Sequence, residues 1–282
     1  MARSAILRAV ALAAGMTIAA GTVAAKDWTS VRIATEGAYP PWNATDSSGK
    51  LVGFEIDLSN DLCERMGVEC EIVAQDWEGI IPALQAGKYD VIMAGMSITE
   101  ERKQVISFSD SYAATPARFA VLQDSELADY QSPIERMVLD EIEPAEQAAI
   151  DDLKSVLDGK TIGVQVATTH ANFLEQHLGD AVEIRKYDTQ ENLDLDLQAG
   201  RVDAALASMS YWAPLLETEK GAGFTVVGPA MTGGPFGAGV GVGIRQDDKK
   251  LVDLFNQAIA AAKEDGTIAR LSEQWFGFDA SS

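Results

Sequence analysis

Near its start the chain reads Ser30-Val31-Arg32-Ile33-Ala34-Thr35-Glu36, an apolar run that ends in an acid. Alternating structure follows: strand patterns cover residues 30–35, 71–74 and 91–94, and helix patterns cover residues 54–66 and 80–86. This alternation is typical of an α/β domain. The stretch therefore predicts an α/β fold whose first strand carries Glu36 at its end.

The same part of the chain contains a base, Arg102, in the stretch Ser97-Ile98-Thr99-Glu100-Glu101-Arg102. Glu36 follows a strand, and ligand clefts of α/β sheets open at the ends of strands. An acid and a base that face one cleft can hold a zwitterion.

A second alternating set predicts a second lobe. Strand patterns cover residues 160–166, 181–187 and 202–207, and helix patterns cover residues 169–177 and 192–200. Each unit contains the same short pattern: a glycine that ends a helix, then a basic residue, then an Asp before a buried strand. The pattern is Gly87-Lys88-Tyr89-Asp90 in the first unit and Gly200-Arg201-Val202-Asp203 in the second. Two similar units in series predict a two-lobed molecule.

The glycine-rich run at residues 233–243 suggests a phosphate-binding loop, but a dinucleotide fingerprint must follow a strand and open a helix. Here glycine alternates with valine over residues 239–244, which predicts a strand that ends in a turn. Residues 251–262 and 266–275 have the patterns of two amphipathic helices, which we expect to cover the first lobe.

Residues 1–25 have the features of an export signal. After a basic start, an apolar stretch covers residues 9–20, and Val23 and Ala25 stand at positions −3 and −1 of a cleavage site. A membrane anchor is the alternative, but the stretch is Ala-rich and shorter than the ~20 residues that span a bilayer. We therefore expect export to the periplasm, and the lack of a Cys beside the cleavage site favours a free protein over a lipoprotein.

Composition narrows the class of protein. About 257 residues would remain after cleavage, enough for one large or two medium domains. Removal of Arg3 and Arg8 with the signal takes the formal charge from −21 to −23. Such a surface repels phosphate backbones and anionic lipid, so we expect no nucleic-acid partner.

The two cysteines, Cys63 and Cys70, form a close pair. In an exported chain such a pair is expected to be oxidised to a disulfide. Cys63 lies near the end of a helix pattern, Gly67 supplies the stop, and Cys70 begins the next strand. A reactive CxxC pair is the alternative, but six intervening residues do not fit that motif.

Residues 124–152 form an acidic segment with ten acids and one base, Arg136. Pro133, Pro144 and several helix formers predict a loose, partly helical insertion on the surface. We expect it to be solvated and without function, with docking of a partner as the alternative.

Several phrases of the chain resemble the family 3 solute-binding proteins of polar amino-acid ABC transporters. They are Ile33-Ala34-Thr35-Glu36, Tyr39-Pro40-Pro41-Trp42-Asn43, Gly53-Phe54-Glu55-Ile56-Asp57-Leu58, Ile81-Pro82-Ala83-Leu84, Ser97-Ile98-Thr99, Phe108-Ser109 and Gly266-Thr267. The resemblance extends to the branches that bind lysine, arginine, ornithine or histidine and to the octopine- and nopaline-binding branch. The opine branch is indicated by Leu206-Ala207-Ser208, Gly228-Pro229, Met231-Thr232-Gly233-Gly234 and Gln274-Trp275-Phe276-Gly277, as well as by the acidic insertion.

The resemblance implies a periplasmic binding protein fold of type II, with two α/β lobes that close on a ligand. Lobe one is then discontinuous, with residues 26–114 and 232–282, and lobe two comprises residues 115–231. The resemblance places the two hinge crossovers near residues 114–118 and 228–232.

The resemblance also implies roles for residues of lobe one. Arg102 would hold the α-carboxylate of the ligand, because its guanidinium offers two parallel donors, and Ser97 would assist it. Glu36 would bind the basic end, and Trp77 would form an aromatic wall, with Tyr39 as a candidate for the opposite wall. The alternatives are a salt bridge of Arg102 with Glu100 or Asp110, a surface turn for Glu36, and core packing for Trp77.

The resemblance implies that four residues of lobe two contact the ligand: Gln165, Thr168, Thr169 and His170. They lie where a strand leads into a helix, and the backbone amides at the start of a helix attract a carboxylate. His170 as a simple capping or surface residue is the alternative.

Ser208 stands where the amino-acid branch has an aspartate that pairs with the ligand's α-ammonium, and Ala94 and Gly95 stand where that branch often has serines. Loss of a buried charge partner costs roughly 2 to 5 kcal/mol, which disfavours a plain amino acid. An arginine-derived opine, octopine-like before nopaline-like because of Ser97, is therefore the expected ligand, and a basic amino acid is the alternative.

The implied function is capture of a small zwitterion for an ABC permease with cytoplasmic ATPases, by a monomer without a cofactor, metal site or catalytic residues. Two other classes were weighed. A dehydratase of cyclic acids on this fold could use Glu36 and His170 as acid and base, but no nucleophile–base pair or metal-spaced cluster is visible. A sensory module of a receptor is the other, but no spanning or signalling segment accompanies it.

Overall fold

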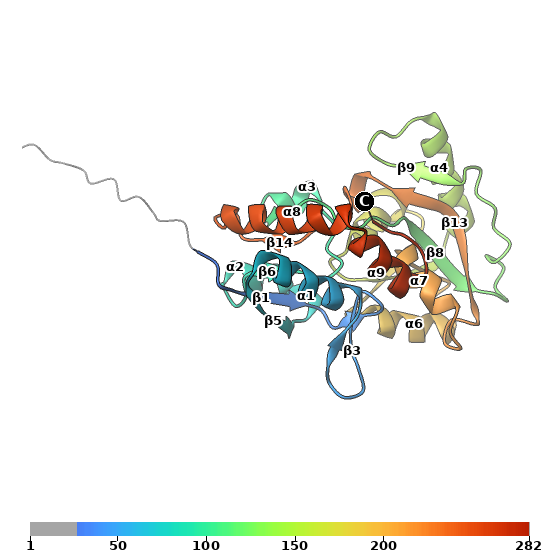
Figure 1. Cartoon of the computed structure of the whole chain (residues 1–282). Coiled ribbons are helices and arrows are strands. Elements are labelled where there is room, and N and C mark those ends of the chain that lie inside the picture. Colours follow the sequence, from blue (N-terminus) through green and yellow to red (C-terminus); the bar gives the residue numbers. More distant parts are fainter. Residues whose placement is uncertain (1–26, 282) are drawn as a thin grey trace, which may run out of the picture.

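The computed structural model describes residues 27–281, so the predicted export signal at residues 1–25 lies outside the described residues. The chain forms two α/β units, each built on its own sheet (Figure 1). Within residues 27–281 no helix is both long enough and apolar enough to cross a membrane.

The first sheet has five strands. In spatial order they are β5 (Glu69–Ala74), β1 (Ser30–Thr35), β6 (Val91–Ile92), β14 (Gly243–Ile244) and β7 (Ser107–Phe108). The first three are parallel, and β14 is antiparallel to both of its neighbours. Because β14 returns from the far end of the sequence, the first lobe is discontinuous, as predicted.

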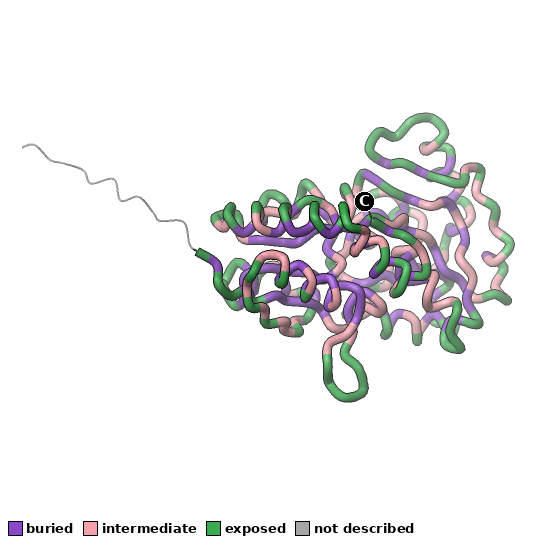
Figure 2. The backbone as a smooth tube through the Cα atoms, in the orientation of Figure 1, coloured by how far each residue is buried: buried purple, intermediate pink, exposed green. Residues whose placement is uncertain are grey.

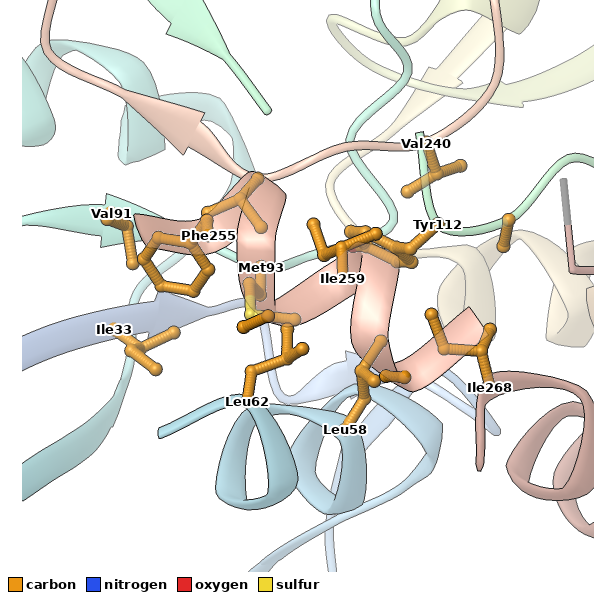
Figure 3. Packing of buried hydrophobic residues seen from close by; sticks show 14 of the residues in the cluster. Ile33, Leu58, Leu62, Val91, Met93, Tyr112, Val240, Phe255, Ile259 and Ile268 are labelled. Atoms are coloured by element: carbon orange, nitrogen blue, oxygen red, sulfur yellow. The ribbon is translucent and has the colours of Figure 1, made fainter. Parts of the chain in front are cut away.

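In the first sheet β6, β14 and the second half of β1 are buried on both faces, as expected of strands covered by helices, whereas the edge strands β5 and β7 are partly exposed. On β1, Ile33 belongs to one apolar cluster and Ala34 to the other. The first face is covered by α1 (Phe54–Met66), α8 (Lys249–Glu264) and α9 (Thr267–Phe276). The second face is covered by α2 (Ile80–Gln85). Leu58 and Leu62 of α1 and Phe255 and Ile259 of α8 meet in the first cluster (Figure 3).

Two expectations about the C-terminal third had different outcomes. The two amphipathic helices cover the first lobe as predicted, and α9 also contacts the second lobe through α7 (Met209–Leu216). The strand predicted at residues 239–244 is wrong except for β14. Gly239 has φ 92°, outside the range of a strand, and Val240 forms only isolated antiparallel bridges with Ser97 and Ala113.

The second sheet has six strands. In spatial order they are β11 (Glu183–Tyr187), β10 (Thr161–Gln165), β12 (Ala204–Ser208), β8 (Ala117–Leu122), β13 (Phe224–Thr232) and β9 (Arg136–Val138). Its first three strands are parallel, as in the first sheet. The helices α4 (Pro144–Leu157) and α5 (Thr169–Phe173) pack on one face, and α6 (Gln190–Gln198) and α7 pack on the other.

Two predicted helices of this lobe differ in detail. The helix expected at residues 169–177 continues beyond α5 as a π-helical turn, Leu174–Leu178. The helix expected at residues 192–200 begins earlier, because the Thr189 hydroxyl caps α6 by accepting a hydrogen bond from the amide of Asn192 at 3.2 Å.

The acidic segment at residues 124–152 is partly helical and largely exposed, as predicted, but it is not a loose insertion. It contributes β9 to the second sheet and most of α4 to its core, with Met137, Ala149 and Ile150 buried. The error has a physical reason: the acids occupy the outward positions, while the apolar residues recur on the inner face of the helix and strand.

A disulfide joins Cys63 and Cys70, as predicted, with their Cα atoms 6.2 Å apart. Gly67 ends α1 in the left-handed conformation, with φ 66°. Cys70 on β5 pairs with Val31 on β1. The bridge therefore links the end of a helix to the start of a strand.

A small third sheet, a hairpin-like unit, projects from the first lobe. It comprises β2 (Ala38–Tyr39), β3 (Asn43–Thr45) and β4 (Leu51–Val52). Figure 2 shows the exposed loop between β3 and β4 at its tip. The base of this unit carries Tyr39 and Trp42 toward the second lobe.

Candidate functional site

A cavity of about 180 Å³ lies between the two sheets and is lined from both lobes. All eleven residues predicted for the site line it: Glu36, Tyr39, Trp77, Ala94, Ser97, Arg102, Gln165, Thr168, Thr169, His170 and Ser208. Among the described residues of its lining, Glu36 is the only carboxylate and Arg102 is the only Arg or Lys. The structure thus brings the predicted residues into one cavity.

Arg102 lies in the short helix α3 (Glu100–Lys103), whose N-cap is Thr99. Its guanidinium donates from Nη1 to the Ser97 carbonyl at 3.0 Å and from Nη2 to the Ala167 carbonyl at 3.3 Å. The salt bridge considered from sequence is not formed: within residues 27–281 no carboxylate pairs with Arg102, and Glu100 pairs with Lys103.

The charge of Arg102 remains available in the cavity. Burial lowers the pKa of Arg102 to about 10, an effect that the carboxylate of Glu101 opposes, so the guanidinium stays protonated at neutral pH. It also lies over the ring of Trp77, 5.3 Å from the centroid, a cation–π distance.

Trp77 begins a 3-10 turn, Trp77–Gly79, after β5. Its ring is buried and belongs to the second apolar cluster of lobe one, so it packs in the core and also lines the cavity. Its Nε1 donates to the Ala167 carbonyl at 3.3 Å. Ala167, in lobe two, has φ 56°, the left-handed region that residues with a side chain rarely adopt.

Glu36 follows β1 and is 9% exposed. Gln165, at the end of β10, donates from Nε2 to its Oε1 at 2.6 Å, a contact between the lobes. Burial raises the pKa of Glu36 to about 7, with the Gln165 hydrogen bond opposing the rise. Glu36 is therefore an acid whose charge responds to pH near neutrality, and the alternative of a surface turn does not apply.

Ala94, Gly95 and Ser97 line the cavity along the segment that connects β6 to α3. Beneath them Glu55 is fully buried: it accepts hydrogen bonds from the Gly95 amide at 2.7 Å and from Asn43 Nδ2 at 2.8 Å, and another from the Tyr112 hydroxyl. Burial raises the pKa of Glu55 to about 7 against these three donors. Glu55 supports the floor of the cavity without lining it.

The start of α5 brings three polar residues to the cavity. Thr168 is the N-cap: its Oγ1 accepts from the Ala171 amide at 3.1 Å and donates to the Gln165 carbonyl at 2.8 Å. Thr169 is buried, and burial together with the nearby Arg102 lowers the pKa of His170 to about 4. The imidazole of His170 is therefore neutral at pH 7.

Ser208 ends β12 and precedes α7. A hydrogen bond joins it to Tyr39, whose ring stacks on Tyr211 with centroids 5.0 Å apart. The Tyr211 hydroxyl donates to Asp194, which also accepts from Gln190 Nε2 at 3.0 Å. Asp194 therefore lies behind Gln190 and Tyr211 and does not line the cavity.

Several residues of the lining were not predicted from the sequence. They are Trp42, Gly95, Gln190, Phe236, Gly237, Gly239, Val240 and residues 114–117, 232 and 233. A signal for Gln190 existed, because it begins the helix after β11, next to the N-cap Thr189. Phe236 lies in an irregular glycine-rich segment that has no strand or helix pattern to place it.

Within residues 27–281 no group of three or more His, Cys, Asp or Glu side chains is arranged to hold a metal ion. The cavity instead offers one acid, one permanent cation, a neutral imidazole and several hydroxyl and amide groups. This set suits an organic ligand that carries both charges.

Comparisons with known proteins agree with the resemblance seen in the sequence. A model of the bacterial extracellular solute-binding proteins, family 3, matches residues 31–278. The octopine-binding periplasmic protein of Rhizobium meliloti is 44% identical over 95% of this chain and 97% of its own length. The L-arginine-binding protein of Pseudomonas aeruginosa is 37% identical over 88% of both chains.

Solved structures also match. A periplasmic His/Glu/Gln/Arg/opine family-binding protein from Silicibacter pomeroyi, in complex with lysine, superposes with a TM-score of 0.71. It is 35% identical, and the match covers 89% of this chain and 99% of that one. The two-lobed fold is therefore shared with proteins of this family.

Proposed function

Because this chain belongs to the bacterial extracellular solute-binding proteins of family 3, we propose that it captures an arginine-derived opine in the periplasm. Its role as a substrate-binding protein follows from the family. The observation that supports the ligand is the lining of the cavity, in which one carboxylate and one guanidinium accompany neutral polar groups.

Arg102 binds the α-carboxylate of the ligand in this proposal. Its Nη1 is held by the Ser97 carbonyl of the same lobe, which orients the guanidinium before a ligand arrives, and its Nη2 donates to the Ala167 carbonyl of lobe two. A bidentate pair with a carboxylate is a strong charge-assisted interaction. Ser97 and the neutral His170 supply further hydrogen bonds to the same carboxylate.

Glu36 binds the basic end. A guanidinium that enters the cavity replaces the Gln165 amide as the partner of Glu36 Oε1 and favours the ionised form of this acid. Trp77 and Tyr39 form aromatic walls along the ligand, although the exposed part of the Trp77 face is shared with Arg102.

The choice of an opine over a plain amino acid rests on Ser208. With Asp194 set behind Gln190 and Tyr211, no second carboxylate lines the cavity to pair with an α-ammonium. An opine carries a second carboxylate on the substituent of that nitrogen, so the ligand itself supplies the missing negative charge. Ala94 and Gly95 leave space for this substituent.

The remaining parts of the proposal concern the setting of the protein. We propose lobe one at residues 26–114 and 232–282 and lobe two at residues 115–231, with cleavage of the signal near Ala25. The protein acts as a monomer that delivers ligand to a membrane permease driven by cytoplasmic ATPases. We propose no catalysis, since the pKa of His170 is lowered to about 4 and its imidazole is therefore a weak base in the cavity.

Isothermal titration calorimetry of the exported protein tests the ligand. Octopine, nopaline, arginine, lysine, ornithine and histidine are titrated in turn, and octopine is expected to bind most tightly. In Arg102→Ala the affinity should fall by roughly 2 to 5 kcal/mol, more than tenfold. Tight binding of free arginine with no binding of either opine would overturn the opine proposal, and unchanged affinity of Arg102→Ala would remove Arg102 from the site. Turnover of prephenate or arogenate would contradict the absence of catalysis.

A further inference from the structure

The acidic segment at residues 124–152 contacts a wall of the cavity. Its strand β9 lies at the edge of the second sheet, parallel to the end of β13, with Met137 beside Met231 and Val138 beside Thr232 (Figure 1). The Leu139 amide then donates to the Thr232 carbonyl at 2.8 Å. Thr232 itself lines the cavity, so β9 is directly bonded to the cavity wall.

Asp140, the next residue of the acidic segment, holds the chain just after Thr232. Its Oδ1 accepts a hydrogen bond from the Gly234 amide at 2.9 Å. Gly233 and Gly234 both have positive φ, 69° and 51°. A Cβ on Gly233 would lie 2.7 Å from the Asp140 carboxylate, so the two segments pack too closely for a side chain at this point.

The segment held by Asp140 continues as the inner wall of the cavity. Phe236 lines the cavity and stacks on Phe173 of α5 with centroids 5.2 Å apart, and it lies 5.7 Å from the ring of His170. Beyond it, the Ala238 amide donates to the Ile98 carbonyl at 2.9 Å, next to Ser97. The wall therefore reaches His170 and the segment of Ser97, two of the residues assigned to the α-carboxylate of the ligand.

We propose that Asp140 is a positioning residue that fixes residues 232–237, so that the acidic segment sets the size of ligand that the cavity accepts. The ligand named in this inference rests on the proposed function. Without the bond from Asp140, the Gly233–Gly234 link is free to move, and Phe236 moves with it. An opine is larger than free arginine, because its α-nitrogen carries an extra carboxylate group, so its binding is affected more by a displaced wall.

Hydrogen–deuterium exchange of the ligand-free protein tests the first step without any ligand. In Asp140→Ala the amides of Gly233, Gly234, Phe236 and Gly237 should exchange faster by about 2- to 10-fold, the loss expected of one hydrogen bond. Asp140→Asn retains an oxygen acceptor and should exchange like the unaltered protein. Glu141→Gln, which removes a charge from the exposed neighbour, is the matched control and should also be unaltered.

Unchanged exchange in Asp140→Ala would overturn the proposal. Equal acceleration in Glu141→Gln would also overturn it, because the effect would then follow from net charge and not from the bond to Gly234. These outcomes do not depend on which ligand the protein binds.

Calorimetry of the same three variants with octopine and arginine tests the second step. Asp140→Ala should lose more affinity for octopine than for arginine, by about threefold or more in the ratio, while Asp140→Asn and Glu141→Gln keep the ratio of the unaltered protein. Equal losses for both ligands would show a merely structural role and overturn the claim on ligand size. If the unaltered protein binds neither ligand, the proposed function fails, and the exchange experiment still decides the role of Asp140.

Discussion

At the scale of the residue, Glu36 is, among the described residues that line the cavity, the one whose charge depends most directly on pH near neutrality. Burial raises its pKa to about 7 in the empty cavity. A cationic ligand binds the ionised form, so protons compete with the ligand below this value. Affinity for a guanidinium ligand should therefore increase as pH rises from 6 to 8, and the increase should level off above the pKa.

Calorimetry of Glu36→Gln at pH 6, 7 and 8 checks this expectation. The variant should bind roughly tenfold or more weakly, since it lacks the charge partner of the ligand, and its affinity should no longer change with pH. His170→Gln is the control: the pKa of His170 is about 4, so its loss should leave the pH dependence in place. A slope that persists in Glu36→Gln would assign the titration to another group.

The candidate residues were predictable where a simple rule applied to them. Glu36, Gln165 and Ser208 all lie at the carboxyl ends of strands, where clefts in α/β sheets open. Their binding roles remain predictions. Phe236 was not predictable, because it reaches the cavity through two positive-φ glycines whose conformation depends on contacts with Asp140, far away in the sequence.

At the scale of the element, periodicity predicted α1 and β1 to the residue, whereas composition misled for the acidic segment. Ile150, Leu153 and Leu157 of α4 recur at helical spacing and are buried, but the two leucines follow residue 152, and ten acids outweigh Ile150 in any average over the segment. Averages of charge ignore which face of an element a residue occupies. The spacing of the apolar residues was the better guide.

The disulfide supports a separate prediction at this scale. Cys63 and Cys70 are seven positions apart, and closing so small a loop stabilises the folded chain by roughly 2 to 3 kcal/mol. The double variant Cys63→Ser/Cys70→Ser should lose this amount of unfolding free energy in urea. Ligand affinity should stay the same, because Cys70 pairs with Val31 at the opposite end of β1 from Glu36.

Reduction of the unaltered protein with dithiothreitol provides the control for that measurement. The reduced protein and the double variant should unfold at similar urea concentrations, since both lack the same bridge. Equal stability of the oxidised protein and the double variant would contradict a stabilising role, and a loss of ligand affinity would show that the bridge also shapes the cavity.

At the scale of the whole molecule, the two lobes contact each other around the cavity. Gln165 bonds to Glu36, and Trp42 Nε1 donates to Ser210 Oγ at 2.9 Å. At the rim, Asn172 Nδ2 of α5 donates to Glu101 Oε2 at 3.2 Å. A ligand enclosed by such contacts can enter or leave only when the lobes separate, so affinity depends on the free energy of closure as well as on direct contacts.

Asn172→Ala tests this coupling, because Asn172 joins the lobes but does not line the cavity. An exposed hydrogen bond to a carboxylate contributes about 0.5 to 1 kcal/mol, so affinity should fall about two- to fivefold. Since the bond forms only after closure, the loss should appear as faster release in stopped-flow fluorescence, with the association rate unchanged.

Small-angle scattering supplies the structural side of this test. Ligand should lower the radius of gyration of the unaltered protein, and Asn172→Ala at saturating ligand should reach the same value, because the variant weakens closure without changing the closed shape. Lys103→Ala is a matched control, since Lys103 lies on the same short helix as Glu101 but pairs within its own lobe with Glu100. If Asn172→Ala slowed association and left release unchanged, the hydrogen bond between Asn172 and Glu101 would form before closure. The bond would then affect the rate at which ligand enters and not the rate at which it leaves.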